Sequence, residues 1–290
     1  MKTDCGLEGA NLCGANLLGV KLNHSEISKS KFCNSFLERA DLSNSVLYCS
    51  DFSYANCYGA QFNEVILDEV NFKGANLVNT HFKSAKIMRA NFMNANLSDA
   101  YFRNAYISNT FFSELRGNSS IFIGSYISFS DFRGSHLESC FFSRAVLEHT
   151  NLGAACLMHT DFSKALLSFV NLGSANLSFA NLSGANLMYV DLRGAKLDGS
   201  NVQGTMITLP DNLVIPTVEK LASRMLNYLR NYGGDELEEF VIFLAQDKGN
   251  ILAQYLGTAT AASLICVASG MDKVPDWNSC KSAASNLSEE

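Results

Sequence analysis

The sequence has little of what marks a membrane protein or a secreted protein. Only three prolines and one tryptophan occur in 290 residues, and the amino-terminal MKTDCGLEGA lacks the apolar core of a signal peptide. The nearest approach to a membrane span, residues 251–270, is interrupted by Gln254 and by threonine, serine and glycine residues. We interpret that segment as a buried helix and predict no membrane partner.

Paired cysteine spacings are also missing. The nine cysteines follow no repeated pair spacing and form no zinc-type CxxC motif. Disulfide scaffolds and structural zinc sites are built on such spacings, so neither class is indicated. We therefore expect a reduced chain in the cytoplasm.

What the sequence does contain is a strict five-residue period. From Leu7 to Ile207, every fifth residue is Leu, Ile, Phe or Val, except at Cys57 and Gly117. Two residues before each of these centres stands Ala, Ser, Thr, Val or Cys, and Leu115 is the single exception. A helix or a strand has a shorter apolar period, whereas a fixed period over so long a stretch indicates a repeat protein.

The repeated segments ADLSN, ANLVN, ANFMN, TDFSK and ANLSG resemble the pentapeptide-repeat family. In that family a small residue, Asn or Asp, and Leu or Phe precede two variable residues. The resemblance covers residues 5–207 and implies a right-handed, four-sided parallel β-solenoid with 20 residues in each coil. The centre and the small residue would point inward, and about ten coils would form a mainly β rod.

Phenylalanine has a spacing of its own, which does not depend on the resemblance. It occupies every tenth residue from Phe52 to Phe142, with Phe32 and Phe162 outside that run, and none of the centres between them. On a four-sided coil these rings fall on two opposite inner walls. Aliphatic residues line the other two walls, one of which includes Leu47, Leu67, Ile87, Ile107, Ile127 and Leu147.

One segment, SELRGNSS at residues 113–120, departs from the pattern. Leu115 occupies a small-residue position and Gly117 occupies a centre, yet the count resumes at Phe122 without slippage. Two interpretations are open. The segment forms a local bulge or bend on one wall, or Leu115 fills the space that Gly117 leaves.

The period ends at TLPDNLVIP, and we predict a linker at residues 208–216. Apolar stripes then predict three short helices in residues 217–270, which would form a small α-helical cap over the open carboxyl-terminal end of the solenoid. Residues 271–290 are predicted to form a tail without regular structure. The amino-terminal end has no comparable cover, so we expect either that the chain is a fragment or that another molecule closes this end.

No pattern of catalytic residues stands out. The phosphate-binding GxxxxGK[ST], the nucleophile motif GxSxG and the zinc motif HExxH are absent, so we predict no enzyme, catalytic residue, metal site or cofactor. His136 and Cys156 would be vertical neighbours on an outer wall, but they lack an orienting partner and further metal ligands. Cys13 and Cys33 would also stack closely enough for a disulfide, and we expect them to be reduced.

Charge bears on the functions that the resemblance suggests. Some members of the family protect DNA gyrase by imitating DNA, and others are interaction modules, including modules of bacterial effectors. Residues 1–207 hold 16 Lys and Arg against 17 Asp and Glu, and residues 208–290 hold 6 against 11. A nearly neutral rod does not favour DNA mimicry, and the absence of a basic stripe with interleaved aromatics disfavours nucleic acid.

We therefore predict a non-enzymatic protein-protein interaction scaffold of bacterial type, either cytoplasmic or secreted into a host cell as an effector. The alternatives are a DNA-mimicking protein that protects gyrase and the recognition fragment of an effector ubiquitin ligase. The partner would be another protein. A homodimer through a solenoid end or the carboxyl-terminal helices is a further option.

The predicted partner-binding site is a column of outward residues beside one aliphatic wall. Tyr106 and Tyr126 are expected to be its main anchors, because tyrosine buries a large area and keeps a polar tip. Two other interpretations remain, in which the carboxyl-terminal helices cover the column or the column only pads the wall. The column and its adjoining corner comprise Val46, Ile66, Lys86, Tyr106, Tyr126, Val146 and Leu166, with Phe129, Phe169 and Tyr189 at the corner.

Overall fold

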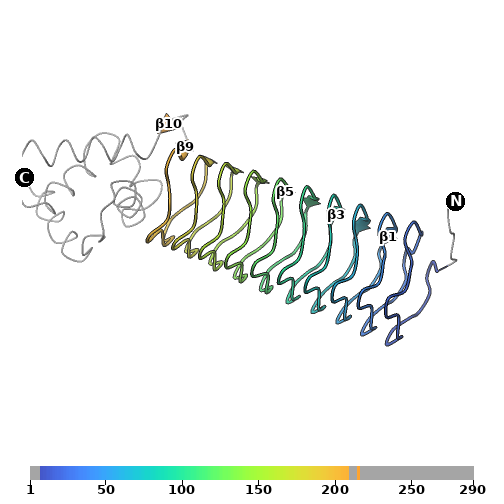
Figure 1. Cartoon of the computed structure of the whole chain (residues 1–290). Helices are drawn as coiled ribbons and strands as arrows, with labels where there is room; N and C mark the ends of the chain where they lie inside the picture. Colours follow the sequence, from blue (N-terminus) through green and yellow to red (C-terminus); the bar gives the residue numbers. More distant parts are fainter. Residues whose placement is uncertain (1–6, 209–213, 216–290) are drawn as a thin grey trace, which may run out of the picture.

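The computed structural model describes residues 7–208 and 214–215, which form a long rod of stacked coils (Figure 1). Each coil takes 20 residues and lies in register on the next, so the predicted parallel β-solenoid is confirmed. The described residues contain no helix. The ten strands are β1 (Val46–Tyr48), β2 (Ile66–Asp68), β3 (Lys86–Met88), β4 (Tyr106–Ser108), β5 (Tyr126–Ser128), β6 (Val146–Glu148), β7 (Leu166–Ser168), β8 (Asn186–Met188), β9 (Met206–Thr208) and β10 (Val214–Ile215).

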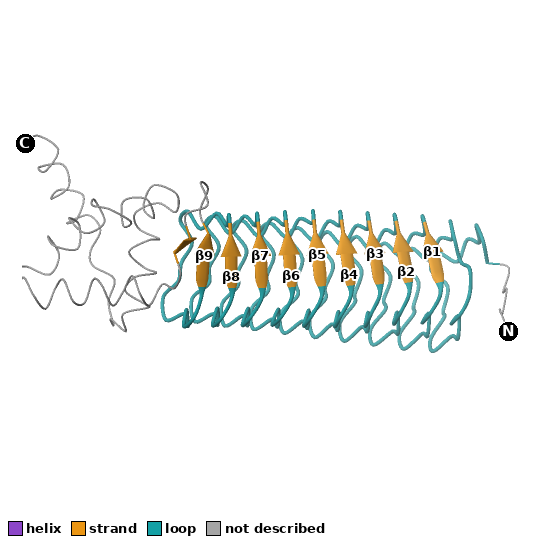
Figure 2. Cartoon of the chain, turned by 90° about the horizontal axis from the view of Figure 1, so that it is seen from above, coloured by secondary structure: helices purple, strands orange, loops and turns teal. Residues whose placement is uncertain are grey.

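Strands β1 to β9 lie side by side in parallel on one side of the rod, as Figure 2 shows from above. We call this side the strand wall. The other three sides hold single-residue parallel bridges between successive coils. In chain order after the strand wall they are the first phenylalanine wall (centres include Phe32 and Phe52), the leucine wall (Leu37, Leu77) and the second phenylalanine wall (Phe62, Phe82).

The rod turns at a backbone feature that recurs every five residues. The second residue after each centre has a positive φ, from Gly9 to Gly204, and most of these residues are not glycine. None of them is Val, Ile or Thr, the side chains that tolerate this conformation least. Outside the strand wall, the amide three residues after a centre commonly donates to that centre's carbonyl, as Ala55 does to Phe52 at 3.1 Å, and closes a tight turn.

Phenylalanine fills the middle of the rod as predicted. Rings stack along each phenylalanine wall with centroids 4.4 Å apart at Phe112–Phe132 and up to 5.2 Å apart at Phe62–Phe82. Rings of opposite walls meet edge to face, as in Phe52–Phe62 at 6.0 Å and 82°. Stacked and edge-to-face contacts are both favourable ring geometries, so the two walls form one continuous core. All twelve of these rings are fully buried.

The irregular segment at residues 113–120 forms no bulge. Arg116 pairs in register with Asn96 below it and His136 above it. The Leu115 side chain is fully buried, and a Cβ added to Gly117 would lie 2.8 Å from Leu115 Cδ1. Leu115 therefore occupies the space of the missing centre side chain, which supports the second of the two interpretations.

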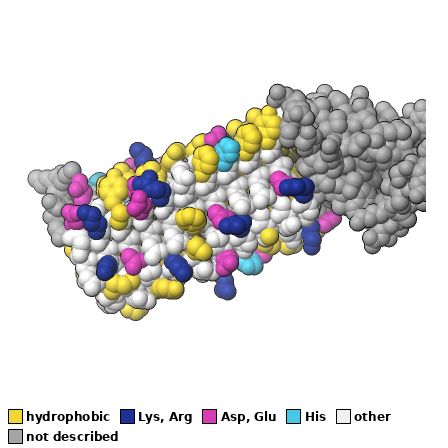
Figure 3. Space-filling model, turned by 180° about the vertical axis from the view of Figure 1, so that it is seen from behind, with side chains coloured by type: hydrophobic (Ala, Val, Ile, Leu, Met, Phe, Trp, Pro, Cys, Tyr) yellow, Lys and Arg dark blue, Asp and Glu magenta, His cyan; other side chains and the backbone are white. Residues whose placement is uncertain are grey.

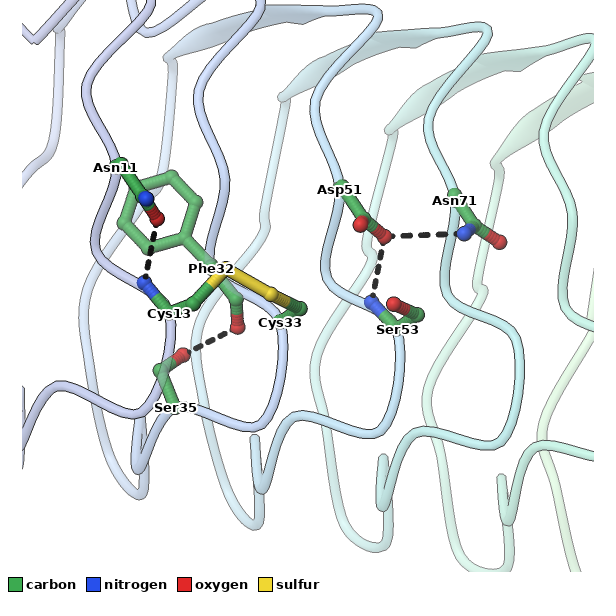
Figure 4. Close-up of a disulfide and its surroundings, with 8 residues drawn as sticks. All are labelled: Asn11, Cys13, Phe32, Cys33, Ser35, Asp51, Ser53 and Asn71. Carbon is green, nitrogen blue, oxygen red and sulfur yellow. Dashed lines mark hydrogen bonds between the residues drawn. A yellow bond between two sulfur atoms is a disulfide. The ribbon is translucent and has the colours of Figure 1, made fainter.

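One expectation about the amino-terminal coils is wrong. Cys13 and Cys33, predicted to be reduced, form a disulfide between the first two described coils, with their Cα atoms 4.6 Å apart (Figure 4). Both follow centres on the first phenylalanine wall, where the in-register stacking of coils brings every twentieth residue together. Their spacing of 20 residues is therefore a pair spacing in this fold, although it resembles no motif in the linear sequence.

At the other end, β10 pairs with β9 in the antiparallel direction, with Val214 opposite Thr208. This short strand hydrogen-bonds the edge that the last strand of the wall would otherwise expose. The predicted helical cap at 217–270 and tail at 271–290 lie outside the described residues, as does most of the predicted linker at 208–216.

Candidate protein interface on the strand wall

The predicted column lies on the strand wall as a continuous vertical row. Ile66 pairs in register with Val46 on one side and with Lys86 on the other, and the same register continues to Leu166. Tyr106 is 45% exposed, and the aliphatic members of the row are half-buried. The column is therefore a surface row formed by the first residue of each strand from β1 to β7, and its role in binding remains a prediction.

The two predicted anchors stack on each other at the middle of the column. The Tyr106 and Tyr126 rings lie 5.3 Å apart and nearly parallel. The Tyr126 hydroxyl donates a hydrogen bond of 2.5 Å to Glu148 Oε2, and this bond raises the pKa of Tyr126 above its usual value. The carboxylate of Glu148 thus holds the Tyr126 ring in place. Among the described residues, no hydrogen bond of this kind holds Tyr106.

A second row of rings runs along the adjoining corner. Phe129, His149, Phe169 and Tyr189 stack in succession with centroids 4.8, 4.8 and 4.7 Å apart. Phe129 and Phe169 are 59% and 50% exposed. Sequence reasoning found three of these residues and missed His149, although His149 stands 20 residues from both Phe129 and Phe169 and so could have been identified. Figure 3 shows hydrophobic side chains and a histidine close together along the upper edge of the rod, near its carboxyl-terminal end.

The backbone under this corner row is in the left-handed region. Phe129, His149, Phe169 and Tyr189 have φ values of 49°, 47°, 54° and 56°. A left-handed conformation costs a non-glycine residue about 1–2 kcal/mol, and the corners of the carboxyl-terminal coils include Gly184, Gly194 and Gly204. Non-glycine residues hold the same conformation at most corners of the described rod, so it sets the position of these four rings and does not by itself indicate a function.

Charged residues flank the lower part of the same wall. Arg89 bridges Asp68 at 2.5 Å and Glu69 at 3.1 Å. Lys86 is exposed and forms no ion pair with any described residue. The strand wall therefore combines an apolar row with a polar section at its amino-terminal half.

The thiol and imidazole pair considered from the sequence does not form a reactive centre. His136 and Cys156 are neighbours in register, but the Cys156 thiol donates to Glu138 Oε1 at 3.0 Å. Burial and this hydrogen bond both raise the pKa of Cys156, which favours the unreactive thiol. Within the described residues, no three His, Cys, Asp or Glu side chains come together as metal ligands.

Charge is spread over all four walls of the described solenoid. Assigning the outward residues at 7–208 to their walls gives 3 cations and 5 anions on the strand wall, 4 and 4 on the first phenylalanine wall, 3 and 4 on the leucine wall, and 5 and 3 on the second phenylalanine wall. The differences are −2, 0, −1 and +2, which sum to −1. No wall of this rod presents the dense negative charge of a DNA duplex.

The described residues include no helix, and therefore no helical membrane span. A family model described as "Pentapeptide repeats" matches the chain in 8 copies, at residues 3–39, 25–56, 55–94, 95–128, 125–163 and 165–204. No curated protein matches the chain.

Several solved structures are similar to it. HetL, a pentapeptide repeat protein involved in heterocyst differentiation regulation in Nostoc sp. strain PCC 7120, is 28% identical over 72% of this chain and 88% of HetL, with a TM-score of 0.26. Rfr23 of Cyanothece 51142 is 29% identical over 32% of this chain and 59% of its own, with a TM-score of 0.28. QnrB1, a plasmid-mediated fluoroquinolone resistance protein, is 20% identical over 68% of this chain and 92% of its own, with a TM-score of 0.35.

Proposed function

Because the chain belongs to the pentapeptide-repeat family, a family of repeat rods, we propose that it is a non-enzymatic scaffold that binds another protein through its strand wall. The binding surface is the strand-wall strip, which we define as the outward column from Val46 to Leu166 together with the corner row from Phe129 to Tyr189. The partner makes its main contacts with Tyr106 and Tyr126, and the corner rings extend the contact toward the carboxyl-terminal end.

The observation that carries this proposal is a row of exposed and half-buried apolar side chains along the strip, which Lys86 and His149 interrupt. Successive coils place the rings of Tyr106 and Tyr126 5.3 Å apart and those of Phe129 and His149 4.8 Å apart, so the side chains form one surface. Large exposed apolar patches on soluble proteins commonly mark interfaces, and tyrosine and other aromatic residues are enriched in their centres. The corner rings add support, because Phe129 and Phe169 are exposed and the packing of the core does not require them.

The alternatives receive less support from the described residues. DNA mimicry requires a rod of strongly negative surface, whereas the strand wall differs from neutrality by −2 and the second phenylalanine wall by +2. We therefore keep gyrase protection as the alternative and the scaffold as the proposal. The roles of effector and of ubiquitin-ligase recognition fragment concern the setting in which a scaffold works, and the same strip would serve either.

Site-specific photo-crosslinking tests the proposal. The full chain carries p-benzoylphenylalanine at position 106, and a matched control carries it at Lys73, an exposed position on the first phenylalanine wall. After irradiation in cells that express the protein naturally, we expect discrete protein adducts from position 106 and none of these from position 73. Mass spectrometry identifies the adduct. Identical adducts from both positions, or none from position 106, would overturn the proposal.

A further inference from the structure

The occupant that best matches the strand-wall strip is a second copy of the chain. Building on the proposed function, we infer that two copies pair strand wall to strand wall in antiparallel order, about a twofold axis that passes beside Tyr106. An axis parallel to the strands reverses the order of the coils and keeps each column of side chains opposite the same column of the partner. A surface suited to this pairing has columns in which residues at equal distances on either side of the axis are compatible with each other.

The main column has this property. Counted in coils from Tyr106, Val46 lies opposite the partner's Leu166, and Ile66 lies opposite the partner's Val146. Both pairs are aliphatic. Tyr106 lies opposite the partner's Tyr106 on the axis itself. The seven residues therefore place chemically similar side chains opposite each other, except for one unlike pair.

That unlike pair brings a cation close to a carboxylate. Lys86, which has no ion pair among the described residues, lies opposite the partner's Tyr126. The Tyr126 hydroxyl is bonded to Glu148 at 2.5 Å, so a carboxylate stands beside the ring that Lys86 approaches. The pairing gives the unpaired ammonium an anionic partner at the edge of an apolar contact.

The corner row is complementary in the same register. Arg89 lies opposite the partner's Phe129, an arrangement that allows a cation–π contact, and Glu69 lies opposite the partner's His149. One like-charge pair arises, because Asp68 lies opposite the partner's Glu148. Each of these carboxylates has its own cation nearby, Arg89 at 2.5 Å from Asp68 and Lys86 across the interface from Glu148.

The size of the surface sets the expected strength. Seven coils at about 4.8 Å per step, with a width of three to four residues, give roughly 350–450 Å² from each copy and about 700–900 Å² in total. This area is at the low end for specific complexes, so we expect a reversible dimer with a Kd on the order of micromolar.

Cysteine crosslinking between two different variants tests the register directly, with a short bismaleimide because facing sheets lie about 10 Å apart, too far for a disulfide. Lys86→Cys and Tyr126→Cys are made separately in the full chain with Cys49→Ser, because Cys49 is exposed near the same wall. Treated with bis(maleimido)ethane, the mixture of the two variants should form a mixed dimer in much higher yield than either variant alone. Lys86→Cys mixed with Val146→Cys is the matched control and should crosslink much less.

Sedimentation velocity over a range of concentrations gives a second measurement that does not depend on cysteine. We expect the unmodified chain to dimerise and Lys86→Glu to raise the dimer Kd at least tenfold. Adding Glu148→Lys should restore the affinity, because the pair of charges is then reversed. Lys83→Glu, the same charge change on the second phenylalanine wall, should have little effect.

The outcomes separate this inference from the proposed function. A chain that stays monomeric and gives no mixed crosslink overturns the second copy as partner, and adducts of another protein at position 106 would then still support the scaffold. Crosslinking of Lys86→Cys with itself, in place of Tyr126→Cys, overturns the antiparallel register. If neither a dimer nor an adduct at position 106 is found, the proposed function is overturned as well.

Discussion

The middle coils and the first described coil are built from the same repeat but are held together differently. In the middle, rings such as Phe92 are fully buried and stack on the rings above and below at 4.9 Å. In the first coil, Leu7, Leu12 and Leu17 are only partly buried, and a disulfide from Cys13 ties the coil to its neighbour. A coil with described neighbours on both sides is stabilised by packing, whereas the first coil has a described neighbour on one side and a covalent link.

Removing a ring from the middle should have the largest effect. Phe92→Ala leaves a cavity between Phe72 and Phe112 and should lower the free energy of unfolding by about 3–5 kcal/mol. Leu12→Ala in the first coil should cost much less, because that side chain is already partly exposed. Chemical denaturation of both variants gives the comparison, and equal losses would show that the two regions are packed alike.

Breaking the disulfide should affect the other region. Cys13→Ser should lower the free energy of opening of the first coil by about 2–4 kcal/mol, because the crosslink no longer limits the open state. Hydrogen exchange at the Leu12 and Leu17 amides, which bond the second coil at 2.7 and 2.8 Å, measures this opening. Exchange at the Phe92 amide should stay unchanged, and a uniform increase along the rod would contradict the distinction between the two regions.

The irregular site in the middle offers a smaller test of core packing. Gly117→Leu should destabilise the rod by about 1–3 kcal/mol, because the new side chain overlaps Leu115 and Leu137. Adding Leu115→Ala should recover most of this loss, since the pair then matches the regular repeat. Thermal unfolding of the two single variants and the double variant completes the cycle, and strictly additive losses would refute the exchange of volume between the two positions.

The smallest effect on stability is expected on the strand-wall strip. Changing both Tyr106 and Tyr126 to Ser should lower the free energy of unfolding by about 1 kcal/mol or less, because both rings lie on the surface and the Phe core is untouched. The same variant should lose dimer formation in sedimentation velocity. A control pair of exposed outward changes on other walls, Lys73→Ser and Lys83→Ser, should leave both measurements nearly unchanged, and a large loss of stability from the tyrosine pair would make the strip part of the core.

The sequence was informative wherever packing of the interior constrains it. The five-residue period and the ten-residue spacing of phenylalanine predict the inner walls, because every coil must fill the same interior space. The left-handed corners were missed because residues as different as His24, Lys29 and Phe129 adopt the same φ there, held by hydrogen bonds between coils that no single repeat reveals.

The candidate site was only partly predictable for a related reason. Outward columns follow from the 20-residue coil, which located the Tyr106 column and placed Cys13 beside Cys33. The oxidised state of that pair was not predicted, and His149 was missed because it was not compared with the residues 20 positions away. The partner itself leaves no such trace, because the core does not restrict the side chains that face outward.

The in-register bonding of coils also governs how such a chain can change during evolution. Loss or duplication of 20 residues removes or adds one layer, and every column of the strand wall stays continuous across the junction. Loss of five residues keeps the leucines and phenylalanines inside but moves all later residues onto the adjacent wall, a quarter turn away. The strand-wall strip would then be divided between two faces, so inheritance of this surface depends on gene rearrangements in whole coils, even though the core tolerates rearrangements in fives.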